Sequence, residues 1–193
     1  MKPHGHASSE IRATTDRQEL NITHDAAIGA WFAESKPMAR DEMLAHVFRF
    51  GHMPVSDRAF IDAVVPGHNR TLMGALGRGT ADENLRPQVE KAENYHIDYI
   101  KADPGNGAAL HSHDTEETFI CLTGAWRIAW GDNGEEHIDL GLYDGICCPP
   151  GVMRSFKNVS DAPALLLSIL GGREPGHVVW ARSMQSKMAA AYM

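Results

Sequence analysis

The sequence predicts an all-β fold with helices at both ends. Two observations lead to this prediction. Between residues 95 and 170, short segments rich in apolar and β-branched residues are separated by clusters of Gly, Pro, Asp and Asn. Before residue 66 and after residue 174, apolar residues recur instead at helical spacing. The chain therefore divides into an N-terminal helical extension, 1–66, a strand-rich middle, 67–173, and a C-terminal helical tail, 174–193.

The N-terminal extension is predicted to hold two or three short helices. The first spans residues 41–50 and ends at Gly51, a usual position for a glycine after a helix. Its apolar face consists of Met43, Leu44, Val47 and Phe48. A second helix is capped by Ser56 and ends at Pro66. Its buried stripe consists of Phe60, Ile61, Val64 and Val65. Residues 26–33 are the candidate third helix.

The strand-rich region begins with segments of differing character. Residues 70–76 predict an outer strand, and residues 81–93 a polar connector. Residues 95–101 alternate apolar and polar side chains and lead into the turn-forming run Asp103-Pro104-Gly105. This alternation predicts the strand that precedes a pair of histidines.

His111 and His113 are two residues apart, so in a β-strand they point to the same side and present two imidazoles to one point. Glu117 has the same parity but would lie roughly 13 Å farther along a continuous strand, and metal–ligand bonds are only about 2 Å. Asp114-Thr115 is suitable turn chemistry. We therefore expect Glu117 to return on an antiparallel strand beside the histidines, in a set of ligands that suits Fe(II), Mn(II), Ni(II) or Zn.

Downstream segments complete the predicted sheet. Residues 118–122 form a strand in which Phe119 and Cys121 share the inward parity of Glu117 and line the pocket. Residues 125–130 and 136–140 form a hairpin around the turn 131–134. Turns follow at 144–145 and 149–151, and the apolar run 164–170 is a buried strand. In the tail, the helical stripe consists of Trp180, Met184 and Met188.

Five positions of the histidine segment together resemble the first motif of the cupin superfamily, G(X)5HXH(X)3–4E(X)6G. These positions are Gly105, His111, His113, Glu117 and Gly124. The resemblance covers roughly residues 67–172 and implies a cupin double-stranded β-helix, a small jelly-roll barrel. It also implies a divalent metal ion, small-molecule chemistry of the dioxygenase, isomerase or decarboxylase kind, and a homodimer.

The second cupin motif, G(X)5PXG(X)2H(X)3N, is met only in part. Pro149, Gly151 and Asn158 match it, but Tyr143 replaces the glycine and Arg154 replaces the histidine that would be the fourth ligand. Arginine stays protonated and has no lone pair for a metal. Three outcomes are open: a metal site with three protein ligands, a site completed by another histidine, or a metal-free barrel in which Arg154 pairs with Glu117. The other histidines considered are His96, His137 and His177.

Two functions therefore compete. In a metal-dependent enzyme, Arg154 binds a substrate carboxylate through its planar guanidinium, and Phe119 and Cys121 line the substrate pocket. In a non-catalytic ligand-binding or scaffold cupin, no metal is bound and Arg154 neutralises Glu117.

Composition narrows the choice of partners. The formal charge of −7, and seven Lys/Arg against nine Asp/Glu in residues 1–66, disfavour nucleic acid and anionic membranes. No apolar stretch approaches the roughly 20 residues of a membrane span. Three cysteines, Cys121, Cys147 and Cys148, indicate no disulfide scaffold. A cytoplasmic protein is expected. His4 and His6 lack strand context and are not assigned to a metal site.

Overall fold

The computed structural model describes residues 36–78, 82, 84–172 and 177–192. The chain divides into a short N-terminal unit, residues 1–38, and a larger unit, residues 39–193, which contains every helix and strand described. The candidate helix at 26–33 and the pair His4 and His6 lie outside the described residues.

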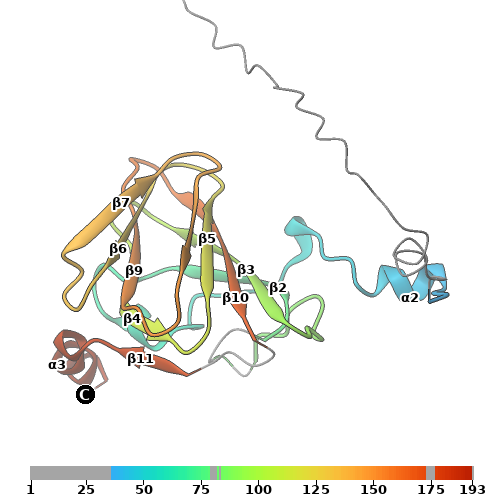
Figure 1. Cartoon of the computed structure of the whole chain (residues 1–193), viewed down its shortest axis with the longest axis horizontal. Coiled ribbons are helices and arrows are strands. Elements are labelled where there is room, and N and C mark those ends of the chain that lie inside the picture. The colour runs from blue at the N-terminus through green and yellow to red at the C-terminus, as the bar shows by residue number, and fades with distance from the viewer. Residues whose placement is uncertain (1–35, 79–81, 83, 173–176, 193) are drawn as a thin grey trace, which may run out of the picture. The chain divides into compact units, whose positions relative to one another are not determined.

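Within the described residues, eleven strands form two antiparallel sheets with the main core between them (Figure 1). The strands are β1 Val55–Ser56, β2 Thr71–Leu76, β3 Tyr95–Ala102, β4 Gly107–His113, β5 Glu117–Cys121, β6 Trp126–Trp130, β7 Glu136–Leu140, β8 Gly145–Cys148, β9 Arg154–Asn158, β10 Ala164–Gly171 and β11 Val178–Trp180. One sheet has the order β1-β2-β3-β10-β5-β8 and the other β11-β4-β9-β6-β7. The all-β prediction is confirmed, including the hairpin of β6 and β7.

The core lies between the two sheets and is built from alternate residues of the strands. Trp126, Phe119 and Phe156 form its aromatic centre, with ring centroids 5.1 Å apart for Phe119–Phe156 and 5.9 Å for Trp126–Phe156. Ile128 and Leu166 are fully buried beside them. Burial of each such side chain stabilises the folded state by about 1.5–3 kcal/mol, so these side chains hold the two sheets together.

The N-terminal helices are shorter than predicted, and only some of their apolar side chains are buried. The α-helix, α2, spans only Arg40–Leu44, and two short 3-10 turns follow, η1 Phe50–His52 and η2 Ile61–Val64. Ser56 lies in β1 rather than at a helix cap. Of the expected buried side chains, Met43, Leu44, Val47, Ile61 and Val64 are exposed, whereas Phe48, Phe60 and Val65 are at least partly buried.

Part of the segment, Phe48 and Met53, instead packs on the outer face of the six-stranded sheet. Met53 packs with Met73 and Ala75, and Ile97 and Tyr99 of β3 contact the same cluster from the outside. β3 therefore reverses the usual pattern of a strand in a sheet with one solvent-exposed face. Its apolar residues Ile97 and Tyr99 point outward, where Met53 of the N-terminal segment packs against them.

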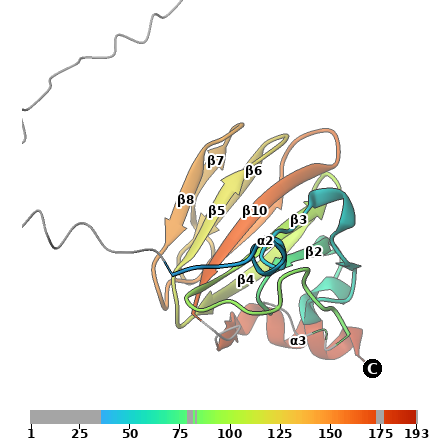
Figure 2. The same cartoon turned by 90° about the vertical axis from the view of Figure 1, so that its right-hand side faces the viewer.

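The C-terminal tail combines a strand with a helix. Trp180, predicted to be helical, belongs to β11, which pairs with β4 so that Trp180 lies opposite His111. The helix α3 spans Arg182–Ala191 and is drawn in red below the strands in Figure 2. Met184 of this helix is buried against Val65 and Ala109. The apolar stripe is thus real, but it begins only after the strand.

Tyr143 is the only non-glycine residue with positive φ (68°) among those that the structure describes. It occupies the position where the second motif has glycine, which adopts this backbone conformation without strain. Its side chain is 76% exposed, so it lies at the surface rather than in the pocket.

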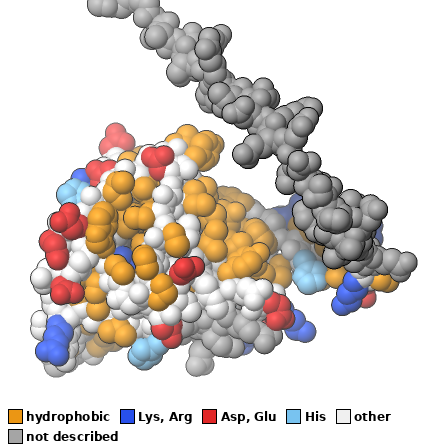
Figure 3. Space-filling model, viewed as in Figure 1, with side chains coloured by type: hydrophobic (Ala, Val, Ile, Leu, Met, Phe, Trp, Pro, Cys, Tyr) orange, Lys and Arg blue, Asp and Glu red, His pale blue; other side chains and the backbone are white. Residues whose placement is uncertain are grey.

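Large apolar side chains also reach the surface of the barrel, between acidic ones (Figure 3). They include Ile138, Leu142, Tyr143 and Val159. The homodimer that the sequence predicts stays a prediction. No helix within the described ranges is both long and apolar enough to cross a bilayer.

Replacing Asn158 with leucine should destabilise the barrel. The fully buried Asn158 amide donates to the carbonyls of Ala102 (2.9 Å) and Ala162 (2.8 Å), and its oxygen accepts the Ser160 N–H (2.9 Å). Asn158→Leu leaves these groups without partners, so we expect the free energy of unfolding in urea to fall by about 2–4 kcal/mol. The exposed neighbour Lys157→Ala serves as control, with a change of about 0.5 kcal/mol or less. Equal effects for both variants would contradict this account.

Candidate metal centre

An irregularity in β4 directs His111 toward the interior. Ala108 pairs with Phe156 and His111 pairs with Arg154, so three steps along β4 correspond to two along β9. Such a bulge re-aims the side chains that follow it. Ala108 and His111 have opposite parity, yet Ala108 belongs to the core and His111 faces Glu117. His113 then follows on the same side as His111, as the sequence predicts.

Glu117 reaches the histidines from the opposite sheet. β5 pairs with β10 and β8, not with β4. The expectation that Glu117 returns on a strand beside the histidines is therefore wrong: the turn after His113 carries the chain across to the other sheet. As a result, the carboxylate faces the imidazoles across the interior, where all three side chains are buried.

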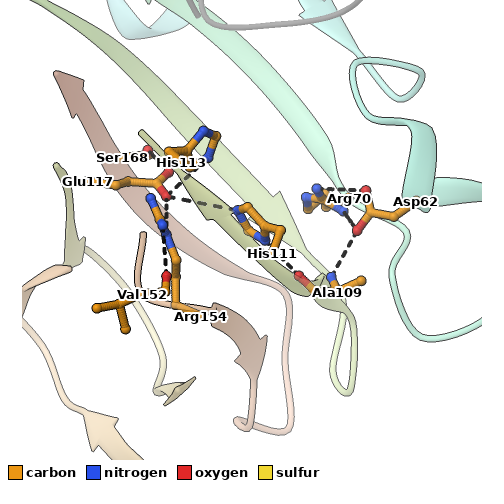
Figure 4. Close-up of polar contacts among 9 residues, drawn as sticks. All are labelled: Asp62, Arg70, Ala109, His111, His113, Glu117, Val152, Arg154 and Ser168. Atoms are coloured by element: carbon orange, nitrogen blue, oxygen red, sulfur yellow. Dashed lines mark hydrogen bonds and ion pairs between the residues drawn. The ribbon is translucent and has the colours of Figure 1, made fainter. Parts of the chain in front are cut away.

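The three side chains converge on one point (Figure 4). Glu117 Oε2 lies 3.5 Å from His113 Nε2 and 4.0 Å from His111 Nε2. One donor atom from each residue lies within 4.8 Å of the others, and this is the only such group in the described part of the chain. Bonds of about 2.0–2.2 Å to a central ion require only a small contraction of this set.

His111 is held in one orientation and one tautomer. Its Nδ1 lies 2.7 Å from the carbonyl oxygen of Ala109, which can only accept, so Nδ1 carries the proton. Nε2 therefore has a free lone pair directed toward Glu117. Burial lowers the pKa of His111 to about 4, with the Glu117 charge opposing the shift, so the ring is neutral near pH 7. The indole of Trp180 covers the ring at 5.2 Å between centroids.

His113 is similarly prepared. Burial lowers the pKa of its imidazole, although Glu117 again opposes the shift. Its Nδ1 is buried without a hydrogen-bond partner among the described residues. The two rings meet edge to face, with centroids 5.1 Å apart. Two neutral imidazoles and one carboxylate form a set of donors that fits a divalent cation.

Arg154 and Ser168 hold the carboxylate of Glu117. Ser168 Oγ donates to Oε1 at 2.9 Å, and Arg154 Nε donates to Oε2 at 3.2 Å. The Arg154 guanidinium is fully buried; Nη1 donates to the carbonyl of Val152 at 3.0 Å. Nη2 is buried with no partner in the described chain. The predicted pairing of Arg154 with Glu117 is thus present, and one further donor stays available.

The histidines considered as a fourth ligand lie outside this group. His137 and His177 are exposed, and His96 is buried on β3 but is not part of the converging set. In the described chain the protein can therefore offer three converging ligands.

Phe119 and Cys121 face inward, as their parity predicts, and both are fully buried in the apolar core. The Cys121 thiol lies 3.5 Å from the carbonyl oxygen of Thr123, in the turn that follows β5. Their role in substrate binding stays a prediction. Cys148 pairs directly with Glu117 across the strands, and burial raises the pKa of its thiol to about 11, so it is a neutral neighbour of the site.

Two polar residues near the site were missed in the sequence. Ser168 is the only polar residue in the run 164–170, and this exception was a usable signal. Asp98 is buried on β3, where it lies opposite Ser168 in the pairing with β10. The Asp98 carboxyl makes no hydrogen bond or ion pair with another described residue. Burial, and then the charge of Glu117, raise the pKa of Asp98 to about 8. Asp98 and Ile100 are two residues apart on one strand and therefore point to the same side. Because Ile100 faces the core, this spacing could have indicated that the Asp98 carboxyl points inward.

A family model, the cupin domain, matches residues 99–170. Among solved structures, the chain is similar to a polyketide cyclase from Streptomyces resistomycificus, with 12% identity, a TM-score of 0.57, and coverage of 76% of this chain and 92% of that one. It is also similar to a cupin-superfamily sugar phosphate isomerase from Silicibacter pomeroyi, with 18% identity, a TM-score of 0.50, and coverage of 70% and 82%. These identities establish the fold alone. No curated protein sequence matches the chain.

The buried groups His111 and Asp98 affect the free energy of unfolding in opposite directions. Because the pKa of His111 is lowered from 6.5 to about 4, the unfolded state binds more protons in that range and stability rises with pH. Because the pKa of Asp98 is raised from 3.8 to about 8, the native state binds the extra proton, and this contribution is lost as the pH rises. Above pH 6.5 the contribution of His111 is complete and that of Asp98 still declines.

We therefore expect the metal-free wild type to lose stability between pH 6.5 and 8 relative to Asp98→Asn. The difference should be about 1.5 kcal/mol, because the slope of about 1.4 kcal/mol per pH unit halves as the pH reaches the pKa of about 8. Urea unfolding of both proteins at the two pH values measures it, with far-ultraviolet circular dichroism to confirm folding. Equal pH slopes in the two proteins would show that Asp98 is ionised in the native barrel.

Proposed function

Since the chain belongs to the cupin superfamily, we propose that it is a metal-dependent enzyme in which His111, His113 and Glu117 hold one divalent cation. The observation that carries this proposal is the His111 ring, which donates Nδ1–H to a backbone carbonyl and directs its free Nε2 toward Glu117. Histidines that bind metals are usually held in this manner. Iron, manganese, nickel and zinc all suit the set of donors.

His111, His113 and Glu117 would hold the divalent cation, which would supply Lewis-acid polarisation of a substrate oxygen. The protein's own residues supply the rest of the site. Ser168 holds the second oxygen of Glu117, and the ring of Trp180 covers the outer side of His111. Phe119, which packs on Phe156 of the aromatic core, would exclude water from the core side of the site. This arrangement supports chemistry on a small molecule of the oxygenase, isomerase or decarboxylase kind.

Arg154 is proposed to bind a carboxylate of that substrate. Its unpartnered Nη2 costs about 1–3 kcal/mol in a buried site unless an acceptor satisfies it. The net charge of the site points to the same conclusion. The charges of two neutral imidazoles, Glu117 and Arg154 sum to zero, and a divalent cation would bring the net charge of the buried site to +2. An anionic substrate reduces that excess, so a carboxylate ligand is favoured over a neutral one.

One observation favours the alternative, a ligand-binding cupin without metal. Arg154 Nε already lies 3.2 Å from Glu117 Oε2, and this buried pair neutralises the carboxylate in the absence of an ion. Because a carboxylate oxygen has two lone pairs, the contact and a metal bond are compatible. Metal content separates the two functions.

Wild-type protein prepared without a polyhistidine tag, equilibrated with Mn²⁺ or Zn²⁺ and then desalted, should retain about one ion per chain by elemental analysis. His111→Ala/His113→Ala should retain almost none, because two of the three ligands are lost. The matched control is His46→Ala/His137→Ala, which also removes two histidines, both exposed, and should retain the ion. Negligible metal in all three proteins would reject the metalloenzyme and favour the scaffold.

Arg154→Leu should separate the effects of this residue on metal and on substrate. A cation about 4 Å away opposes a divalent ion by about 4 kcal/mol per unit charge at an effective dielectric of 20. Its removal should strengthen Mn²⁺ binding by about tenfold or more in isothermal titration calorimetry. The same variant should bind succinate, in the presence of metal, about tenfold more weakly or worse, because the guanidinium is lost.

The exposed Arg127, paired with Asp139 on the surface, provides the control variant Arg127→Leu, which should change neither affinity. Weaker metal binding by Arg154→Leu would show that the guanidinium supports Glu117 as a ligand. Unchanged succinate binding would reject Arg154 as the carboxylate anchor.

A further inference from the structure

The bulge in β4 leaves backbone groups that the strand ladder does not satisfy, and each finds a specific partner. The Ala109 N–H donates to Asp62 Oδ2 at 2.9 Å. The Ala109 carbonyl accepts from His111 Nδ1 at 2.7 Å. The Leu110 carbonyl accepts the Ala181 N–H at 3.0 Å. The backbone of Ala109, through its N–H on one side and its carbonyl on the other, therefore connects a side chain of η2 to the imidazole of His111.

Asp62 is itself rigidly held. Its side chain is fully buried, and its two oxygens accept from Arg70 Nη1 and Nη2, both at 3.0 Å. Arg70 Nη1 also donates to the Gly107 carbonyl at 2.9 Å, one residue before the bulge begins. This paired, planar geometry fixes the position of the carboxylate that the Ala109 N–H meets (Figure 4).

Arg70 and Asp62 form a desolvated ion pair, with the guanidinium placed among aromatic rings. The guanidinium lies 3.9 Å from the centre of the Phe60 ring and 5.6 Å from that of Phe156, and only 3% of the residue is exposed. A buried ion pair is often no more stabilising than apolar side chains of the same size. Stability alone therefore gives a weak reason for this pair, whereas placing an acceptor beneath the bulge gives a specific one.

We propose that Asp62 is a positioning residue for His111: its carboxylate holds the backbone N–H of Ala109, and the backbone carbonyl of the same residue holds the imidazole with Nε2 toward Glu117. The inference rests on the proposed metal function, but the geometry belongs to the metal-free protein. Asp62 and Arg70 both precede residues 99–170, so support for the centre comes from outside the segment that matches the cupin domain.

Two double variants test the proposal as a matched pair. Asp62→Leu/Arg70→Met and Asp62→Asn/Arg70→Met both remove the ion pair, so neither leaves a buried charge unpaired. They differ only at position 62, where leucine has no acceptor and the asparagine oxygen can accept the Ala109 N–H. Tyr192→Phe is the control for the attachment of η2, because it removes the 2.9 Å hydrogen bond to the Ile61 carbonyl without touching the bulge.

Two measurements are made on each protein. Long-range ¹H–¹⁵N spectra of the metal-free protein report which ring nitrogen of His111 carries the proton. Titration with Zn²⁺ reports the dissociation constant. We expect the leucine variant to lose the fixed Nδ1–H tautomer and about tenfold or more in Zn²⁺ affinity, a loss typical of residues that orient metal ligands. The asparagine variant and Tyr192→Phe should keep the tautomer and stay within about threefold of wild type.

Equal behaviour of the leucine and asparagine variants in both measurements would overturn the proposal. If the leucine variant does not fold, amide hydrogen exchange of the wild type decides: an Ala109 N–H that exchanges as fast as exposed loop amides would also overturn it. A fixed His111 tautomer that depends on position 62, in a protein that binds no Zn²⁺, would support the positioning role and reject the proposed metal function. The two failures are therefore distinguishable.

Discussion

The carboxylate of Glu117 is the point on which the centre depends, because it joins the two sheets. It projects from β5 of one sheet, is held there by Ser168 of β10, and meets Arg154, His111 and His113 of the other sheet. Every one of these groups is buried. A carboxylate in such a place is stable only when it is satisfied, so the distance between the sheets and the chemistry of the site are set together.

The sequence predicts the barrel well because a strand is a local pattern. Alternation, the 131–134 turn and the apolar run 164–170 each depend on neighbouring residues, and the strands β3, β5, β6, β7 and β10 lie where these patterns place them. The candidate ligands His111, His113 and Glu117 are found for the same reason, since their spacing within one short segment carries the signal. The pairing of β5 was wrong because a turn of three residues serves a hairpin or a change of sheet equally well.

What the sequence does not reveal depends on contacts between distant segments. The patterns of 41–50 and 56–66 are helical in periodicity, yet these segments form only short helical turns. Phe48 packs with Met73 on the outer face of the sheet and Val65 packs with Met184 of α3, so contacts between distant residues override a weak preference for helix. Trp180 fits a helical stripe, but the free edge of β4 recruits it into β11. Asp62 and Asp98 look like ordinary polar residues, because only the folded barrel brings one to Ala109 and the other to Ser168.

The exchange of a fourth ligand for Arg154 changes how the centre balances its charge. A histidine there would add a neutral donor and leave the ion's charge to be met by the substrate alone. Arg154 instead compensates Glu117 in the metal-free site, and under the proposed function it would oppose a bound ion. An anionic ligand that turned the guanidinium away from Glu117 would relieve this opposition. In the proposed enzyme, metal and carboxylate would therefore favour each other's binding, and linkage requires that effect to be equal in both directions.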